Sequence, residues 1–537
     1  MTLPRDPAPR GGGSTAPRAW WRVPWYPVAV PLAFILLVWA DSLLPAVWLI
    51  RPVVVVVAFS LGLTAVLSAV VRDRNRAALA AWAIVVALVV RELAASALLA
   101  LVAVFVVGEG IVHRGTPWRF GARISSALSV LSVLLVAVTV VSGLSGGAVS
   151  TAVDEVADDL ARAARADTFN PATPDIYVIL LDGYPGDDAL ASLAPGFDRN
   201  AFPNQLTSRG FSVERGSRSN YLLTRLTLPS MFNGQQLGDV HALNGVVGAG
   251  DPWDSVVLRE ATDEGAVWKA VGDAGMDRIA ISSGWAQLGL RRVERVIDPP
   301  QLTEFEFTLL RGSGLGELVT DVAPQMGPAQ TADRIKTALT SARDLAAEDH
   351  TRPRFVFVHV PAPHEPWVFT DDGGLNLDTP GGYLDKFGGG EKLTRDEKIA
   401  RLTGHITYLD KLVVDAVDGI LAATKRPTAI VLFSDHGSDV GFDPNNALGS
   451  DLNERTSNIL AVRTPGKTDV LPAGTTLVNV LPRVLNAYLG TSLPIQPDTT
   501  WAWRGKSVLS FVQIQRDAAS GTWAAVTPVG AAGGAAP

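Results

Sequence analysis

The chain has 537 residues, of which 47% are hydrophobic, and its mean hydropathy of +0.22 is too high for an ordinary soluble protein. Its formal net charge is −7, and the part that follows the apolar region has no basic stripe, which argues against nucleic acid as a partner. The sequence contains no cysteine, so disulfides, thiol nucleophiles and sulfur-ligated zinc are excluded.

The apolar residues are concentrated near the N-terminus. Residues 1–24 are rich in Pro, Gly and Arg and are predicted to form a disordered cytoplasmic segment, retained because it lacks the features of a signal peptide. Residues 25–143 are predicted to contain five transmembrane helices, since a span needs about 20 apolar residues. The predicted spans are Val28–Ile50, Pro52–Val71, Ala77–Val90, Leu93–Val112 and Ile124–Gly143. Asp41 and Pro45 interrupt the first span, and the third is short.

Basic residues predict the orientation. Arginines lie in the N-terminal segment, in the loop Arg72–Arg76 and in the loop His113–Arg123, and five spans place all of them on one side. Since Lys and Arg near spans stay in the cytoplasm, the chain after Gly143 is predicted to be extracytoplasmic. Four spans with a cytoplasmic domain are the alternative, which would leave one basic loop outside. The Ala, Arg, Val and Gly content is typical of a high-GC genome, which indicates a bacterial cell membrane.

The remaining chain divides into three predicted segments. Residues 144–173 are predicted to be a linker, helical around Val153–Ala164. Residues 174–510 are predicted to be one large α/β domain, or at most two, with a central, mostly parallel sheet flanked by helices. Residues 511–537 are predicted to be a C-terminal tail.

Two apolar strands of this domain end in carboxylates. Ile176–Leu181 is followed by Asp182 and a glycine, and Ala429–Phe433 is followed by Ser434, Asp435, His436 and Gly437. Uninterrupted apolar runs are typical of buried parallel strands, whose carboxyl ends form the ligand-binding edge of an open α/β sheet. One such strand end is a weak signal, but two in one domain predict that the carboxylates meet at a metal site.

Hydroxyl residues precede a helix between these two strands. The segment Ser219–Gly234 carries Thr224 and Thr227 ahead of Pro229, which is predicted to lie just inside the start of the helix. One interpretation is that either threonine caps the helix. The other is that a hydroxyl at a helix N-terminus, close to a cation, is an activated nucleophile beside a phosphate site.

Histidines accompany the next strand, predicted over Phe355–Val360. His359 lies within the strand and is interpreted as a core residue, whereas His364 lies in the turn PAPHEPW and is the better functional candidate. A long amphipathic helix is predicted over Thr394–Thr424, and His405, next to its apolar stripe, is interpreted as structural.

These motifs, in this order, resemble the alkaline phosphatase superfamily, which includes the sulfatases. The segments ILLDG, NYLLTRLTLPSMFN, VPAPHEPWVF and LFSDHG lie between about residues 175 and 490. Together with the N-terminal spans they resemble the membrane-anchored transferase branch of lipoteichoic acid synthases, phosphoglycerol transferases and phosphoethanolamine transferases.

The resemblance implies roles for individual residues. Asp182, Asp435 and His436 match metal ligands, and His364 matches a histidine near the leaving group or the substrate phosphate. Thr224 matches the nucleophile and a further metal ligand, because these transferases place a Thr five residues before the Pro of the helix. Phosphodiesterases and sulfatases place the nucleophile two residues before a Pro, which would select Thr227. Arg455 either contacts the phosphate or forms a surface ion pair.

The resemblance also implies an activity. We expect one divalent metal ion, Mn²⁺, Mg²⁺ or Zn²⁺, and transfer of a phosphoglycerol- or phosphoethanolamine-type group from a phospholipid, through a phospho-Thr, to a glycan or lipid acceptor of the cell envelope. A formylglycine sulfatase is disfavoured, because the C-x-P-x-R pattern aligns with Thr227, Pro229 and Met231. A metal-dependent phosphodiesterase or phosphatase of the same fold and a non-catalytic, degenerate domain are the alternatives.

Overall fold

The computed structural model describes most of the chain, and it divides into two compact units. One consists mainly of residues 23–145 and the other mainly of residues 165–526. The described residues are 23–40, 46–90, 93–114, 116, 118–145, 165–237, 251–285, 288–290, 292–323, 325–377, 393–505, 507–517 and 519–526. The predicted disordered segment up to residue 22, and the predicted linker helix Val153–Ala164, lie outside these residues.

The N-terminal unit is helical. Its elements are α1 (Tyr26–Ala40), the 3₁₀ helix η2 (Ala46–Leu49), α2 (Ile50–Val71), α3 (Arg74–Val89), α4 (Leu93–Val112) and α5 (Arg119–Ser145). Within the described residues, three helical stretches are long and apolar enough to cross a membrane, namely Val47–Val71, Ala95–Val112 and Phe120–Val141. The apolar side chains of Val54, Leu61 and Val66 on α2 are more than half exposed, as expected of a surface that faces lipid.

The predicted number of five spans is not confirmed. Helices α1 and α3 contain 15 and 16 residues, fewer than the about 20 that a hydrocarbon core requires. The predicted first span, Val28–Ile50, is wrong at its end, because Ile50 is the first residue of α2 and lies in the apolar stretch Val47–Val71. Residues 41–45 of this predicted span lie outside the described residues.

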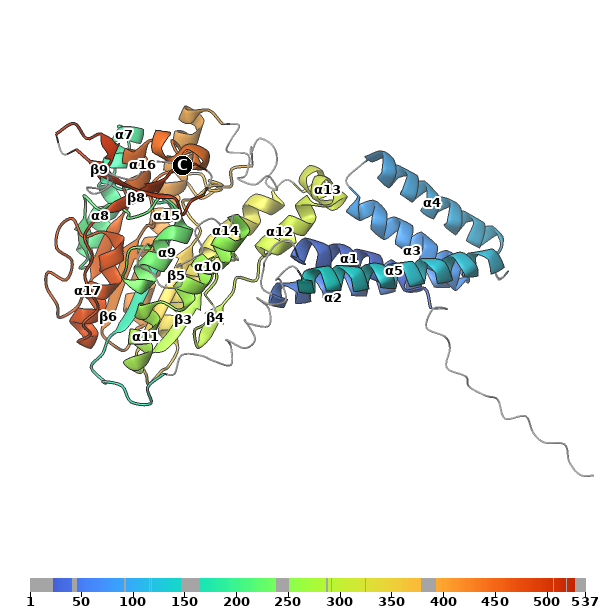
Figure 1. Ribbon diagram of the computed structural model, residues 1–537, viewed down its shortest axis with the longest axis horizontal. Helices are drawn as coiled ribbons and strands as arrows, with labels where there is room; N and C mark the ends of the chain where they lie inside the picture. Colours follow the sequence, from blue (N-terminus) through green and yellow to red (C-terminus); the bar gives the residue numbers. More distant parts are fainter. Residues whose placement is uncertain are drawn as a thin grey trace, which may run out of the picture. The chain divides into compact units, whose positions relative to one another are not determined.

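The second unit is built on a seven-stranded sheet (Figure 1). The strands follow the order β2-β7-β6-β1-β5-β3-β4. The neighbours from β6 to β4 are all parallel to one another, whereas β7 is antiparallel to both of its neighbours, β6 and β2. Their bounds are β1 (Asp175–Leu181), β2 (Ser212–Glu214), β3 (Asp277–Ile281), β4 (Arg295–Ile297), β5 (Arg354–Val360), β6 (Thr428–Phe433) and β7 (Leu460–Arg463). Strands β1, β5 and β6 are buried at every residue, as their apolar sequences predicted. The predicted α/β fold with a mostly parallel sheet is confirmed.

Helices cover both faces of the sheet (Figure 1). One face packs against α7 (Asp187–Leu193), α8 (Ala201–Ser208), α14 (Met326–Ala347) and α15 (Arg395–Ala423). The other packs against α9 (Thr224–Asn233), α11 (Ala266–Asp273) and α17 (Leu477–Leu489). Tyr177 and Ile179 of β1 belong to the first core, and Ile176, Val178 and Leu180 to the second, because successive side chains of a strand point to opposite faces.

The remaining described elements lie around this sandwich. They are α10 (Asp251–Asp263), α12 (Glu304–Arg311), α13 (Gly314–Val322), the 3₁₀ helix η7 (Pro444–Gly449), α16 (Leu452–Thr456), β8 (Thr500–Trp503), β9 (Phe511–Arg516) and β10 (Trp523–Ala525). Strands β8, β9 and β10 form a separate three-stranded antiparallel sheet. Within the predicted tail, residues 511–537, strand β9 pairs with β8 and contributes Ile514 to a small apolar core.

Helix α15 confirms the amphipathic helix predicted over Thr394–Thr424. Thr394 caps its N-terminus, and the Glu397 side chain accepts a hydrogen bond from the Thr394 backbone, which completes a capping box. His405 is buried, and its Nδ1 accepts a hydrogen bond from the Phe369 backbone at 3.2 Å. Burial lowers the pKa of His405 to about 3. This histidine is therefore neutral and structural, as predicted.

Helix α15 also carries a buried carboxyl group, which makes stability depend on pH. The Tyr184 hydroxyl donates a 2.9 Å hydrogen bond to Asp410, and burial raises the pKa of Asp410 to about 8. The folded protein therefore holds this proton more tightly than the unfolded chain. The stabilisation is complete below the unfolded pKa of about 4 and is lost as the pH rises through about 8.

We expect Asp410→Asn to remove this dependence, because an amide still accepts the tyrosine hydrogen bond but does not titrate. The difference in melting temperature between variant and wild type should increase in favour of the variant from about pH 5 to about pH 8. Thermal melts of both proteins across this range measure it. A difference that is independent of pH would contradict the assignment.

Candidate active site

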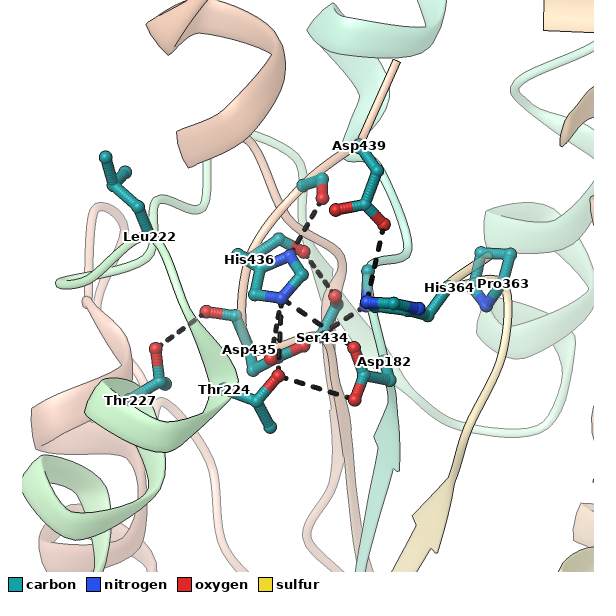
Figure 2. A network of polar contacts seen from close by, with 12 residues as sticks. Asp182, Leu222, Thr224, Thr227, Pro363, His364, Ser434, Asp435, His436 and Asp439 are labelled. Carbon is teal, nitrogen blue, oxygen red and sulfur yellow. Dashed lines mark hydrogen bonds and ion pairs between the residues drawn. The ribbon is translucent and has the colours of Figure 1, made fainter. Parts of the chain in front are cut away.

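Asp182 and Asp435 lie at the carboxyl ends of adjacent parallel strands, β1 and β6. In β1 and β6 the residues two and four positions before these carboxylates face the core that contains α9. Asp182 and Asp435 continue this alternation, and both are fully buried. Figure 2 shows them converging beside His436, the next residue of the β6 loop. The predicted meeting of the two strand ends is thus observed.

The three side chains form a compact cluster. His436 Nε2 lies 3.1 Å from Asp435 Oδ2 and 3.7 Å from Asp182 Oδ1. One ligand atom from each residue lies within 4.8 Å of the others, and all three residues are buried. Within the described part of the chain, this is the one group of His, Asp and Glu side chains that meets this criterion.

Two glycines allow the loops to approach each other. Gly183 has φ +76°, a conformation that favours glycine, and its backbone N–H donates a 3.1 Å hydrogen bond to Asp435 Oδ1. A Cβ on Gly437 would lie 2.0 Å from the carbonyl oxygen of Glu454, so only glycine lets this loop pack against α16. These approaches hold Asp435 and His436 against Asp182.

The arrangement fits a cation. Nδ1 of His436 donates a 2.9 Å hydrogen bond to the Gly437 carbonyl, so the lone pair of the neutral ring is on Nε2, which faces the two carboxylates. Burial, followed by the charge of Arg455, lowers the pKa of His436 to about 4, which keeps the ring neutral. Among the described residues, none donates a hydrogen bond to Asp182 Oδ1. Lone pairs of two carboxylates and one imidazole thus converge where a divalent cation would neutralise them.

The pKa values of the two carboxyl groups are shifted in opposite directions. Burial raises the pKa of Asp435 to about 7, and the negative charge of Asp182 contributes to this rise. Burial also opposes ionisation of Asp182, but the hydrogen bond from His359 and the positive charge of His364 lower the pKa of Asp182 below its ordinary value. Without a cation the two carboxylates do not ionise easily together.

Thr224 is the first residue of α9, and its hydroxyl reaches the cluster. Oγ1 lies 3.4 Å from Asp182 Oδ2 and 3.4 Å from His436 Nε2. The helix cap is Leu223, which makes no side-chain cap bond, so the interpretation of Thr224 as a cap is wrong. The predicted position of Pro229 is also wrong. It lies inside α9, where Asn233 donates a side-chain hydrogen bond to its carbonyl, and the helix begins five residues earlier.

Thr227 has a different partner. It is one turn further along α9, and its hydroxyl donates a 3.1 Å hydrogen bond to the backbone carbonyl of Asp435. This bond fixes α9 against the β6 loop (Figure 2). The structure therefore brings the Thr224 hydroxyl, and not that of Thr227, to the carboxylates and His436.

His359 is part of the site, although the sequence indicated a core residue. It is buried in β5 opposite Leu180 of β1, and its Nε2 lies 2.9 Å from Asp182 Oδ2. Phe355 and Phe357 of the same strand face the α9 side of the sheet, and His359 continues that alternation. His359 therefore orients the Asp182 carboxylate.

His364 lies at the edge of the cluster, as the turn motif predicted. Its ring centroid is 6.5 Å from that of His436 and 5.0 Å from that of Trp285, and its backbone N–H donates to the Asp182 carbonyl at 2.8 Å. Burial alone would lower the pKa of His364, but the carboxylates of Asp439 and Asp182 raise it to about 9. The imidazole is therefore a proton donor at neutral pH.

Asp439 was not singled out from the sequence, and Arg455 is not on the surface. Arg455 is buried, and its guanidinium pairs with the Asp439 carboxylate. Despite burial, His364 and Arg455 hold the pKa of Asp439 well below its usual range. The surface ion pair considered for Arg455 is thus a buried one. A direct contact of Arg455 with substrate phosphate stays a prediction.

A segment of the chain matches a known family. Residues 311–469 match the family model described as Sulfatase. This match confirms the resemblance to the alkaline phosphatase and sulfatase superfamily. The matched segment includes His364, Asp435, His436 and Arg455, whereas Asp182 and Thr224 precede it. No curated protein matches the sequence.

Several solved structures are similar to the chain. One is the C-terminal periplasmic domain of EcEptC from Escherichia coli, at 12% identity and a TM-score of 0.41, covering 65% of this chain and 96% of that chain. A second is the integral membrane protein lipooligosaccharide phosphoethanolamine transferase A from Neisseria meningitidis, at 12% identity and a TM-score of 0.36, covering 86% of this chain and 95% of that chain. A third is the phosphonate monoester hydrolase SpPMH from Silicibacter pomeroyi, at 14% identity and a TM-score of 0.41, covering 60% and 74%.

Proposed function

We propose that the protein is a membrane-bound, metal-dependent phosphotransferase that moves a phosphoglycerol- or phosphoethanolamine-type group from a phospholipid to a cell-envelope glycan or lipid. The observation that carries the proposal is the convergence of the Thr224 hydroxyl, at the N-terminus of α9, with Asp182, Asp435 and His436. A hydroxyl beside a cation site and a helix N-terminus has the surroundings of a phosphoryl-accepting nucleophile.

Asp182, Asp435, His436 and the Thr224 oxygen would hold one divalent ion, Mn²⁺, Mg²⁺ or Zn²⁺. Bound there, such an ion lowers the pKa of a neighbouring hydroxyl and neutralises charge on phosphate oxygens. His359 keeps the Asp182 carboxylate oriented, and the N-terminus of α9, the positive end of the helix dipole, favours a phosphate beside Thr224.

The residues then support two half-reactions. In the first, the Thr224 hydroxyl releases its proton to solvent and its oxygen forms a bond to phosphorus, while the lipid alcohol oxygen takes the electron pair of the breaking P–O bond and a proton from His364. In the second, the acceptor oxygen forms a bond to phosphorus and its proton returns to His364, while the Thr224 oxygen takes the electron pair of the breaking P–O bond and a proton from solvent. The cycle regenerates both residues.

The long apolar helices of the N-terminal unit support a membrane location, with the second unit on the extracytoplasmic side of a bacterial membrane. A phospholipid donor fits this location. Hydrolysis is the second candidate. The first half-reaction is then unchanged, and water takes the place of the acceptor hydroxyl in the second. A degenerate, non-catalytic domain is disfavoured by the presence of every member of the cluster.

The test is intact-mass spectrometry of the full chain in detergent after incubation with Mn²⁺ and either phosphatidylglycerol or phosphatidylethanolamine, with fragmentation of any adduct. We expect a glycerophosphate or phosphoethanolamine adduct on Thr224, which identifies the donor. Bound metal with release of the headgroup phosphate but no adduct would favour the hydrolase. Neither metal nor adduct would contradict an enzymatic function.

A further inference from the structure

Asp439 lies between two cationic side chains at the edge of the site, those of Arg455 and His364. Figure 2 shows Asp439 beside His364. Its Oδ1 accepts a hydrogen bond from Arg455 Nη1, and its Oδ2 lies 3.9 Å from His364 Nε2. The three residues come from the β6 loop, from α16 and from the turn after β5. The carboxylate therefore connects the loop of the cation site to the turn that carries His364.

Arg455 fixes the Asp439 carboxylate in place. Its Nε donates a 2.8 Å hydrogen bond to the carbonyl of Leu222, two residues before Thr224, and its guanidinium carbon lies 3.9 Å from the centre of the Phe442 ring. The arginine side chain is almost fully buried. A guanidinium held by a backbone carbonyl and an aromatic ring offers Asp439 a rigid partner.

Asp439 faces one particular nitrogen of His364. Nδ1 of His364 donates a 2.7 Å hydrogen bond to the Glu365 carbonyl, so Nε2 is the nitrogen that faces Asp439. The distance of 3.9 Å is longer than a hydrogen bond, which spans about 3.2 Å at most. Asp439 thus attracts the imidazole without binding its Nε2 proton, which stays available to a substrate oxygen.

We propose that Asp439, fixed by Arg455, is a positioning residue that aims Nε2 of His364 at the leaving oxygen of the donor. The inference builds on the proposed function, in which the alcohol oxygen takes the Nε2 proton together with the electron pair of the breaking P–O bond. Transfer from a donor with an aliphatic alcohol needs this proton, because an alkoxide is a poor leaving group. Transfer from a nitrophenyl donor does not, because nitrophenolate leaves as an anion.

The test compares Asp439→Asn with wild type in the full chain, using two phosphodiester donors that differ only in an aliphatic or a 4-nitrophenyl leaving group. Asparagine keeps the shape and still accepts the hydrogen bond from Arg455. We expect the rate with the aliphatic donor to fall by about 10- to 100-fold and the rate with the nitrophenyl donor by less than about 3-fold. Asp443→Asn is the matched control, since the exposed Asp443 lies in the same loop and accepts a hydrogen bond from the Asn445 backbone.

A double-mutant cycle with His364→Ala tests whether Asp439 acts through the histidine. With the aliphatic donor, adding Asp439→Asn to His364→Ala should lower the rate by less than about 2-fold. An equal loss with both donors, or fully additive losses in the cycle, would overturn the positioning role. If wild type forms a Thr224 adduct with both donors, either of these outcomes contradicts the positioning role of Asp439 and leaves the proposed function intact. If no adduct forms, the proposed function fails first.

Discussion

Thr224→Ala is expected to abolish turnover and adduct formation while the protein keeps its fold and its other metal ligands. The alanine lacks the oxygen that lies 3.4 Å from both Asp182 Oδ2 and His436 Nε2. Loss of a covalent nucleophile costs on the order of 10⁴- to 10⁶-fold in rate. Because Leu223 rather than Thr224 caps α9, the helix loses no cap and the melting temperature should change little.

Thr227→Val is the matched control for this experiment. Valine has nearly the shape of threonine but cannot donate the hydrogen bond to the Asp435 carbonyl. We expect a loss of about 1 kcal/mol in stability, with an adduct still forming on Thr224. Rates and intact masses are measured for both variants under the same conditions. Activity that survives Thr224→Ala but not Thr227→Val would refute Thr224 as the nucleophile.

The sequence predicted the sheet and its ligand-bearing edge because both depend on local patterns. Uninterrupted apolar runs indicated β1, β5 and β6. The carboxylates of the site follow two of these strands, Asp182 directly after β1 and Asp435 two residues after the end of β6. The period of the stripe on α15 likewise predicted its bounds within a residue at each end. For these strands and for α15, residues that are close together in the sequence determine the structure that forms.

Two members of the site could not be read from local patterns. His359 lies in an apolar strand. The alternation of side chains along a strand shows which residues share a face of the sheet, but it does not show which strand lies next to it. Its role follows only from the pairing of β5 with β1, which brings it to Asp182. Asp439 lies in a loop whose path is set by distant backbone hydrogen bonds, such as the 2.7 Å bond from Gly437 to the Arg455 carbonyl.

The start of α9 shows a third limit of local patterns. Proline is common in the first turn of a helix, so the sequence alone predicts that this turn lies at Pro229. The helix instead begins at Thr224, where the Thr227 hydroxyl bond to the β6 loop and the burial of Leu226 and Leu228 fix the first turn. Tertiary contacts thus extend the helix ahead of its proline.

The second large effect is expected from Asp435→Asn, which should abolish metal binding and stabilise the metal-free protein. The asparagine oxygen still accepts the hydrogen bond from Gly183, so the loop keeps its anchor. The amide nitrogen replaces an oxygen that lies 3.1 Å from His436 Nε2, and it donates to that lone pair. The variant therefore removes a buried negative charge next to Asp182. Its amide N–H also forms a hydrogen bond with the lone pair that would bind a cation in the wild type.

Thermal melting of the full chain with excess Mn²⁺ and with chelator measures both effects. At a metal concentration about 100 times its dissociation constant, wild type gains about 2.7 kcal/mol, and a 100-fold weaker site gains only about 0.4 kcal/mol. In the presence of chelator, the variant should melt at a higher temperature than wild type. Asp443→Asn, in the same loop but outside the cluster, should respond to Mn²⁺ as wild type does. A variant that keeps the full metal-induced shift would show that Asp435 is not a ligand, because its carboxylate would then be dispensable for the cation.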